Sequence, residues 1–216
     1  DKLNHMYPKF VAGGNAHGYD PAVLEKIWKD WTAFASYAFN KSHATCYSWV
    51  AYQTAYLKAN FPAQYMAAVM SRSIGNIADL TKFLDECKAM RLVCLGPDVN
   101  ESYRKFSVNH LGDIRFGLGG IKGLGDNAVQ AIIDERERGG KFTSVFDFFE
   151  RVNLNICNRK NLECLALSGA FDSFGEMRRE QFFGQRESGL PYLDALHTYG
   201  QRFQMEHEES TNSLFG

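Results

Sequence analysis

The chain has 216 residues, of which 45% are hydrophobic and 23% charged, and its formal net charge is −1. This composition fits a globular chain long enough for one large or two small domains, and it excludes a disordered chain. The near-neutral charge excludes a general basic field, so any binding of nucleic acid depends on local patches and backbone amides. No apolar run approaches the roughly 20 residues of a membrane helix, so we expect no contact with a membrane. The chain does not begin with Met, and we expect a piece of a longer protein.

The chain has five cysteines, an odd number, and none of them forms a C-x-x-C pair: Cys46, Cys87, Cys94, Cys157 and Cys164. This spacing argues against both a disulfide framework and a metal site. We therefore expect reduced, mostly buried thiols in a cytoplasmic protein.

The first helix signal comes at Asp20 and Pro21. Residues 1–19 contain three glycines and are expected to be a tail followed by a loop. Asp20 is a favourable N-cap and Pro21 a favourable first helical residue, and the apolar residues that follow recur at helical spacing. We therefore predict an amphipathic helix after residue 20.

A second long helix is expected after residues 37–43 and should end near Asn60. Ser42 can cap it, and Lys41 and His43 then lie beside the free amides of its N-terminus. A cation, a hydroxyl and an imidazole at such a position suit a phosphate. A plain Ser cap with an exposed Lys and a hydrogen-bonded His fits the same pattern, and the local sequence favours neither interpretation.

Two further helices are predicted before the pattern changes. Phe61-Pro62 starts one of them, and Asn76 can cap the next. Residues 93–95 look like a short strand, and alternation at 106–108 and 114–116 around a Gly-Asp turn predicts a β-hairpin. We expect a domain boundary at about residues 90–105.

The hairpin runs into a glycine-rich segment, residues 119–128, which holds the main candidate site. Gly123 and Gly125 flank Leu124, and helical apolar spacing follows from Ala128. The order apolar-Gly-apolar-Gly-x-x-Ala is typical of a helix-hairpin-helix, a motif that binds nucleic-acid phosphates without reading bases. Ile121 and Leu124 would anchor the turn in a core, while the amides from Gly123 to Ala128 would face outward at a helix N-terminus. The candidate phosphate-binding residues are Lys122, Gly123, Leu124, Gly125, Asn127 and Ala128. The alternative is a glycine turn before an ordinary amphipathic helix.

A second, degenerate copy of this module is predicted downstream. Thr143 or Ser144 would cap one helix, and another would run from Asn158 to Gly169. This copy is expected to supply core more than contacts. A polar helix over residues 176–188, a helix from Pro191 and an acidic tail are predicted to follow.

Catalytic motifs are missing from the sequence. There is no D-x-D pair, no H-E-x-x-H, no G-x-S-x-G and no P-loop, so a two-metal site for phosphoryl transfer is not expected. DNA glycosylases with a helix-hairpin-helix carry a lysine after the second hairpin glycine and an aspartate further on. Here Asp126 follows Gly125, and Val145 stands where that aspartate would fall, which argues against this class.

Several separate stretches resemble one family, the alpha subunits of bacterial replicative DNA polymerase III, which are C-family polymerases. They are Phe39-Asn40-Lys41-Ser42-His43, Tyr52-Gln53-Thr54, Phe61-Pro62-Ala63, Phe116-Gly117-Leu118-Gly119-Gly120-Ile121-Lys122-Gly123 and Ser168-Gly169-Ala170-Phe171-Asp172. The resemblance covers about residues 5–180 in the same order, and its most specific part is the Phe-Asn-Lys-Ser-His stretch with the downstream Tyr-Gln-Thr.

The resemblance implies a mainly α fold with a small β-hairpin. Residues 1–100 would be the C-terminal part of the fingers domain, residues 101–175 the tandem helix-hairpin-helix domain, and residues 176–216 a helical extension and linker toward the clamp-binding region. Lys41, Ser42 and His43 would face the primer-template and the incoming dNTP, and the hairpin would hold duplex DNA. The catalytic aspartates and their Mg²⁺ would lie in a palm domain upstream, so this chain alone would bind no metal or cofactor and would not polymerise.

The family also carries a clamp-binding peptide after the hairpin module, which starts with Gln and ends in two apolar residues. Residues 211–215 occupy this place and end in Leu214 and Phe215, but they start with Thr. The sliding clamp and other replicase subunits are therefore candidate partners. A rival from another class is a stand-alone, non-enzymatic helix-hairpin-helix module that binds DNA or protein.

Overall fold

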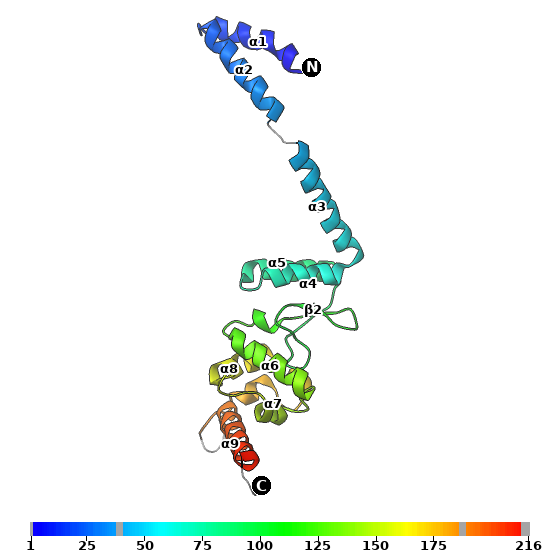
Figure 1. Ribbon diagram of the computed structural model, residues 1–216, viewed down its shortest axis with the longest axis vertical. Helices are drawn as coiled ribbons and strands as arrows, with labels where there is room; N and C mark the ends of the chain where they lie inside the picture. Colours follow the sequence, from blue (N-terminus) through cyan, green and yellow to red (C-terminus); the bar gives the residue numbers. More distant parts are fainter. Residues whose placement is uncertain (1, 38–40, 186–188, 213–216) are drawn as a thin grey trace. The chain divides into compact units, whose positions relative to one another are not determined.

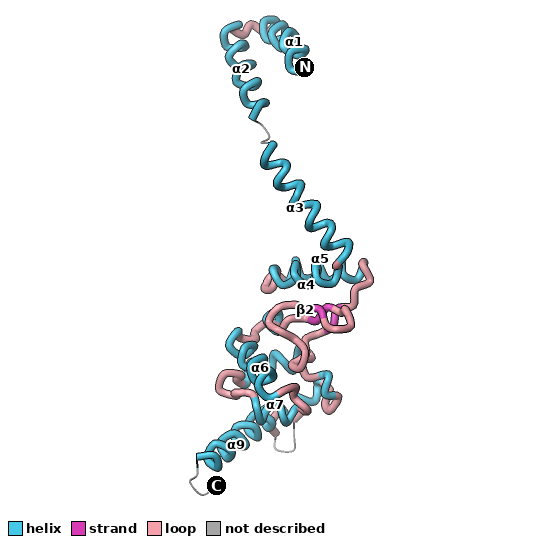
Figure 2. The backbone as a smooth tube through the Cα atoms, turned by 45° about the vertical axis from the view of Figure 1, so that its right-hand side comes forward, coloured by secondary structure: helices cyan, strands magenta, loops and turns pink. Residues whose placement is uncertain are grey.

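The computed structural model describes residues 2–37, 41–185 and 189–212 and is mainly helical, with one small sheet (Figures 1 and 2). This confirms the predicted fold class. The chain divides into two compact units, residues 1–56 and 57–216, which are described separately below. None of the described helices is both long and apolar enough to span a membrane.

The first unit is built around two helices that lie side by side, α1 (Lys2–Ala16) and α2 (Pro21–Tyr37). The predicted start of α2 is confirmed, because the Asp20 carboxylate accepts a hydrogen bond from the Ala22 amide at 2.8 Å. The prediction that residues 1–19 are a tail and a loop is wrong. Aromatic contacts with α2 hold this segment as a helix: the ring centroids of Tyr7 and Phe10 lie 5.3 and 5.2 Å from that of Trp28.

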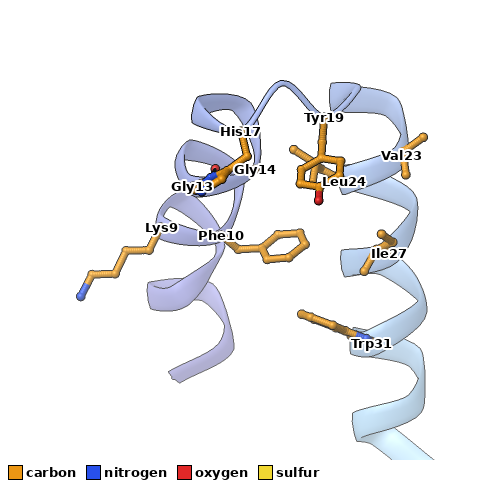
Figure 3. Close-up of a pocket in the computed structure, with 10 residues that line it drawn as sticks. All are labelled: Lys9, Phe10, Gly13, Gly14, His17, Tyr19, Val23, Leu24, Ile27 and Trp31. Atoms are coloured by element: carbon orange, nitrogen blue, oxygen red, sulfur yellow. Dashed lines mark hydrogen bonds between the residues drawn. The ribbon is translucent and has the colours of Figure 1, made fainter.

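The glycines of α1 suggested a loop, but Gly14 lets the two helices approach. A Cβ atom at Gly14 would lie 2.4 Å from Leu24 Cδ1, closer than any side chain can pack. Figure 3 shows Leu24 of α2 facing Gly14, with Phe10 and Trp31 further along the pair. Between the helices lies an apolar cleft of about 590 Å³.

The next three helices largely follow the prediction. They are α3 (Lys41–Asn60), α4 (Pro62–Arg72) and α5 (Ile77–Ala89). The cap of α5 is confirmed, because Asn76 accepts a hydrogen bond from the Asp79 amide at 3.2 Å. The described part of α3 begins at Lys41, directly after residues outside the described ranges, and the Ser42 cap stays a prediction.

A three-stranded sheet packs against α4 and α5. Its strands are β1 (Cys94–Leu95), β2 (Ser107–Val108) and β3 (Ile114–Arg115), in the order β1-β3-β2. The predicted hairpin is confirmed, since β2 pairs antiparallel with β3 and Val108 lies opposite Ile114. β1 adds in parallel on the other side of β3. Phe106 and Ile114 bury their side chains against Met66 and Met70 of α4 in one hydrophobic cluster.

The larger hydrophobic cluster begins at Val99 and holds the two predicted hairpin modules. Its elements are η1 (Leu118–Gly120), α6 (Asp126–Gly139), α7 (Val145–Arg151), α8 (Arg159–Ser168), η2 (Asp172–Phe174), η3 (Arg179–Phe182) and α9 (Tyr192–Asn212). Ser144 caps α7 by accepting the Asp147 amide, and Gly169 ends α8 in a left-handed conformation with φ 82°. Phe116 packs against both clusters and so joins the sheet to the hairpin modules. The predicted domain limits lie at residues 100 and 175. These limits stay a prediction.

Two predictions for the C-terminal part are wrong. The helix expected over residues 176–188 is present only as the short turn η3, because Phe182 is drawn into the core against Phe171 at 5.5 Å between ring centroids. Residues 186–188 of this segment lie outside the described residues. The acidic tail, expected as a linker, is helical and continues α9 to Asn212. Within this helix Arg202 and Glu206 form an i,i+4 ion pair. Leu214 and Phe215 lie outside the described residues.

Candidate nucleic-acid interface

The hairpin between η1 and α6 is built as the sequence predicts. The side chains of Ile121 and Leu124 are buried, with 8% and 9% of their surface exposed, and belong to the larger cluster. The Leu124 amide donates to the Ile121 carbonyl at 3.2 Å and closes the turn. Gly123 has φ 88°, a left-handed conformation that side chains disfavour. The two apolar residues therefore anchor the turn, and Gly123 is required by its backbone geometry.

The predicted phosphate-binding residues divide into an exposed and a buried set. Lys122, Gly123, Gly125 and Asn127 are exposed, whereas Leu124 and Ala128 are buried. Leu124 and Ala128 can therefore act only through their backbone and by fixing the turn.

The amides at the start of α6 are only partly available. The Gly125 amide, which we expected to face outward, donates to Asn161 Oδ1 at 3.1 Å. The first intrahelical bond runs from the Val129 amide to the Gly125 carbonyl. Within the described part of the chain, the amides of Asp126, Asn127 and Ala128 find no acceptor, and Gly125 offers no capping side chain. Three amides at the positive end of the helix dipole are thus left for a ligand.

The second hairpin module differs at the same position. Asn158 precedes α8, and its side-chain oxygen accepts the amides of Lys160 and Asn161 at 3.1 and 3.2 Å. The first turn of α8 is thus capped by the chain itself. Leu162 and Leu165 on this helix are fully buried. This difference supports the prediction that the second copy supplies core more than contacts.

Asn161 joins the two modules and was missed in the sequence. Its side chain accepts the Gly125 amide of the first hairpin and donates to the Ile156 carbonyl in the second, each at 3.1 Å. It is 8% exposed. No local pattern marks it, because its partner Gly125 lies 36 residues away.

Arg104 places a cation beside the start of α6, and the sequence gave no signal for it either. Its guanidinium forms an ion pair with the Asp126 carboxylate at 2.7 Å. A second nitrogen donates to the Asp126 carbonyl at 3.3 Å and to Gln130 at 3.4 Å. The pair lowers the local negative charge that Asp126 alone would present to an approaching anion.

Arg136 of α6 binds the backbone of the segment that carries Arg104. Arg136 lies near the C-terminal end of α6 and is only 8% exposed. Its guanidinium donates to the carbonyls of Val99 and Ser102 at 2.9 and 2.8 Å and lies 5.0 Å from the centre of the Tyr103 ring. This buried cation therefore ties α6 to the segment that precedes Arg104.

Lys41, Ser42 and His43 lie in the other unit, and all three are exposed in the first turn of α3. The Lys41 carbonyl accepts a hydrogen bond from the Thr45 hydroxyl at 2.9 Å. The rings of His43 and Tyr47 lie 4.2 Å apart between centroids. Their contacts with primer-template and nucleotide stay a prediction.

All five cysteines are free, but only some are buried as expected. Cys87 and Cys157 are fully buried, whereas Cys46 and Cys94 are exposed. Burial raises the pKa of the Cys157 thiol to about 12, and burial with the neighbouring Cys94 does the same for Cys87. The two buried thiols therefore stay protonated at neutral pH. Among the described residues, no group of three or more His, Cys, Asp or Glu side chains could hold a metal ion.

Comparison with known proteins agrees with the fold and with the predicted helix-hairpin-helix. A family model described as a helix-hairpin-helix motif matches residues 91–181. The chain is 44% identical over its full length to the DNA polymerase III subunit alpha of Borreliella burgdorferi and covers 18% of that protein. It is 42% identical to the same subunit of Mycobacterium tuberculosis over 83% of the chain, and 43% identical to that of Pasteurella multocida over 78%, covering 15% of each.

The chain thus spans less than a fifth of the length of these relatives. The similarity nevertheless extends through the whole sequence, from the segment before α3 to the helix-hairpin-helix region. The chain is therefore homologous to a segment of the bacterial DNA polymerase III alpha subunit, and this segment contains a helix-hairpin-helix.

Proposed function

We propose that this segment holds the primer-template of a replicative DNA-directed DNA polymerase without carrying its catalytic centre. The observation that carries the proposal is the start of α6, where three amides that have no acceptor among the described residues follow an exposed hairpin. Relatives named as the DNA polymerase III alpha subunit supply the context.

The proposed contact is made to phosphates, because the backbone supplies most of the donors. A phosphate oxygen at the amides of Asp126, Asn127 and Ala128 gains hydrogen bonds and the positive end of the helix dipole. Lys122 is exposed one residue before Gly123 and adds a cation. Such contacts position a duplex without reading its sequence.

The fingers contribution is the second part of the proposal. Lys41, Ser42 and His43 are exposed in the first turn of α3, where a helix N-terminus favours anionic groups. In the whole polymerase they would contact the primer-template and the incoming dNTP. Catalytic Mg²⁺ would bind in a palm domain outside this segment, and the segment alone would not polymerise.

A contact with the sliding clamp completes the proposal. Leu214 and Phe215 would dock as the apolar end of a short peptide that follows α9. A shortened chain that ends at residue 212 should then lose affinity for the clamp, measured by surface plasmon resonance. Equal affinity of both chains would refute this part alone.

The rival function, a packing module without DNA, predicts that the hairpin is covered by another helix. Gly123, Gly125 and Asn127 are exposed instead. Of the four amides from Gly125 to Ala128, only that of Gly125 has an acceptor among the described residues. The exposed turn therefore favours DNA binding over a purely structural role.

Fluorescence anisotropy with two duplexes of unrelated sequence, at low and moderate salt, tests the proposal. We expect weak binding that is equal for both duplexes and falls steeply with salt, because phosphate contacts release counterions. Salt-insensitive binding that prefers one sequence would refute it.

A matched pair of glycine variants isolates the hairpin. Gly123→Ala forces a side chain into φ 88° with Cys164 Sγ 3.0 Å from its Cβ, whereas Gly125→Ala has φ −74° and meets only Asn161 Oδ1 at 3.7 Å. The left-handed strain costs about 1–2 kcal/mol. We expect Gly123→Ala to weaken binding more than either Gly125→Ala or Lys122→Ala. The reverse order, in variants that fold, would contradict the hairpin mechanism.

A further inference from the structure

We infer a second binding site for the sugar-phosphate backbone of DNA, in a groove between α4 and β2. The groove has a volume of about 660 Å³ and lies within the unit of residues 57–216. The inference rests on the proposed function, because it extends the path of the DNA that the hairpin holds.

The rim of this groove is basic. Arg72 ends α4 and Lys105 precedes β2, and both are exposed. In the described part of the chain neither forms an ion pair with a carboxylate. None of the ten residues that line the groove is acidic. Two cations without a protein counterion therefore face the same opening and favour an anionic ligand.

Polar side chains add neutral donors between the two cations. Gln64, Ser107 and Asn109 line the groove. The Asn109 side-chain oxygen accepts the amides of Leu111 and Asp113 at 3.0 and 2.9 Å, which fixes the side chain. Its amide nitrogen donates to no acceptor within the described residues and can reach a phosphate oxygen.

The floor of the groove is apolar. Ala67, Ala68, Phe106 and Val108 line it, and the Ser71 hydroxyl binds the carbonyls of Ala67 and Phe106 and so joins α4 to the strand. A nucleic-acid strand alternates anionic phosphates with deoxyribose rings that carry apolar faces. A basic rim over an apolar floor matches this alternation, whereas a free phosphate would use only the rim.

Adjacent residues connect the groove with the hairpin. Lys105 lines the groove, and Arg104 directly before it forms the ion pair with Asp126 at the start of α6. The Arg104 carbonyl also accepts the Gly119 amide at 3.0 Å. The two basic sites therefore lie on one continuous segment, and we expect a strand bound at α6 to continue toward the groove.

Salt titrations of the 216-residue chain with duplex DNA test the inference. We expect Arg72→Ala and Lys105→Ala each to reduce the slope of log affinity against log salt by about 1, because each removes one phosphate contact. Each variant should also bind several-fold more weakly at low salt. Lys88→Ala removes an exposed lysine of α5 that does not line the groove and should leave the slope unchanged. Lys105→Arg, which keeps the positive charge, should bind as well as the wild-type chain.

The outcomes separate this inference from the proposed function. If the wild-type chain binds DNA and Gly123→Ala weakens it, but Arg72→Ala and Lys105→Ala behave like Lys88→Ala, the groove is not a DNA site and the hairpin proposal stands. If the wild-type chain binds no duplex at any salt, both fail. If the groove variants weaken binding of poly-glutamate but not of DNA, the groove is a site for acidic peptides and the inference is overturned. Circular dichroism of each variant checks that it folds.

Discussion

Replacing Asn161 by Leu tests whether the second hairpin module holds the first in place. Asn161 is buried and connects Gly125 to Ile156 through two side-chain hydrogen bonds of 3.1 Å. Leu has a similar size but cannot make either bond, so Asn161→Leu removes the connection and leaves its volume filled. Asn161→Asp is the matched control, because a carboxylate still accepts the Gly125 amide but cannot donate to Ile156.

The expected loss of stability follows from these two bonds. A net contribution of about 0.5–1.5 kcal/mol is typical of one hydrogen bond, and a partner left unsatisfied in a buried place costs more. Asn161→Leu should therefore destabilise the unit of residues 57–216 by about 2–3 kcal/mol. Asn161→Asp loses one bond and sets a carboxylate oxygen against the Ile156 carbonyl, which the favourable charge in the first turn of α8 offsets in part, so we expect a smaller loss of about 1–2 kcal/mol.

The distribution of tryptophans makes the measurement specific. All three, Trp28, Trp31 and Trp49, lie within residues 1–56, so their fluorescence reports the first unit, while far-ultraviolet circular dichroism reports both. In urea, Asn161→Leu should shift the dichroism transition and leave the fluorescence transition in place.

Amide exchange provides the direct readout for this substitution. The Gly125 amide should exchange faster in Asn161→Leu and remain protected in Asn161→Asp, as followed by nuclear magnetic resonance. A Gly125 amide that stays equally protected in the Leu variant would refute the proposed link between the modules.

Three further predictions concern other sites. Arg91, directly after α5, has a left-handed φ of 57°. Arg91→Gly should raise the free energy of unfolding by about 0.5 kcal/mol, because the relief of about 1–2 kcal/mol of strain exceeds the cost of the added entropy of the unfolded chain. A lower midpoint in urea would contradict this. Burial lowers the pKa of His197 below its ordinary 6.5, and the nearby Asp194 opposes this shift. The stabilisation linked to the neutral imidazole is complete above pH 6.5 and is lost as the pH falls from there through the pKa of the folded state. Urea midpoints should therefore fall between pH 7.5 and 5, and less so in His197→Leu. In the whole polymerase, Lys41→Ala and His43→Ala should slow nucleotide incorporation without lowering thermal stability; normal kinetics would favour a purely local role for both residues.

Local signals in the sequence were sufficient for several of the helix starts. Asp20 and Asn76 were predicted as caps, Ser144 as one of two candidate caps and Asn158 as the start of a helix, because each acts on amides two or three residues away. The turn at Gly123 was predictable for the same reason, since its conformation depends on a few neighbouring residues.

Long-range contacts account for what the sequence did not predict. The helix α1 depends on packing against Trp28 of α2, which outweighs its glycines. The segment around Phe182 follows the surface of the core instead of its own helical pattern. At the candidate site, Asn161 and Arg104 come from 36 and 22 residues away in sequence from their partners. Neither could be found from spacing, because only the folded chain brings them to the start of α6.

The cap of α8 has a consequence for the state of the molecule between binding events. The Asn158 oxygen occupies the place in the second module that an anion would take in the first. The amides at the start of α8 are therefore already bound by the chain's own side chain, and the stability of the second module does not depend on whether a ligand is bound at the first. Under the proposed function, the first module would bind and release DNA repeatedly while the second module keeps its geometry. This is what a protein needs if it must keep hold of a moving duplex without refolding at every step.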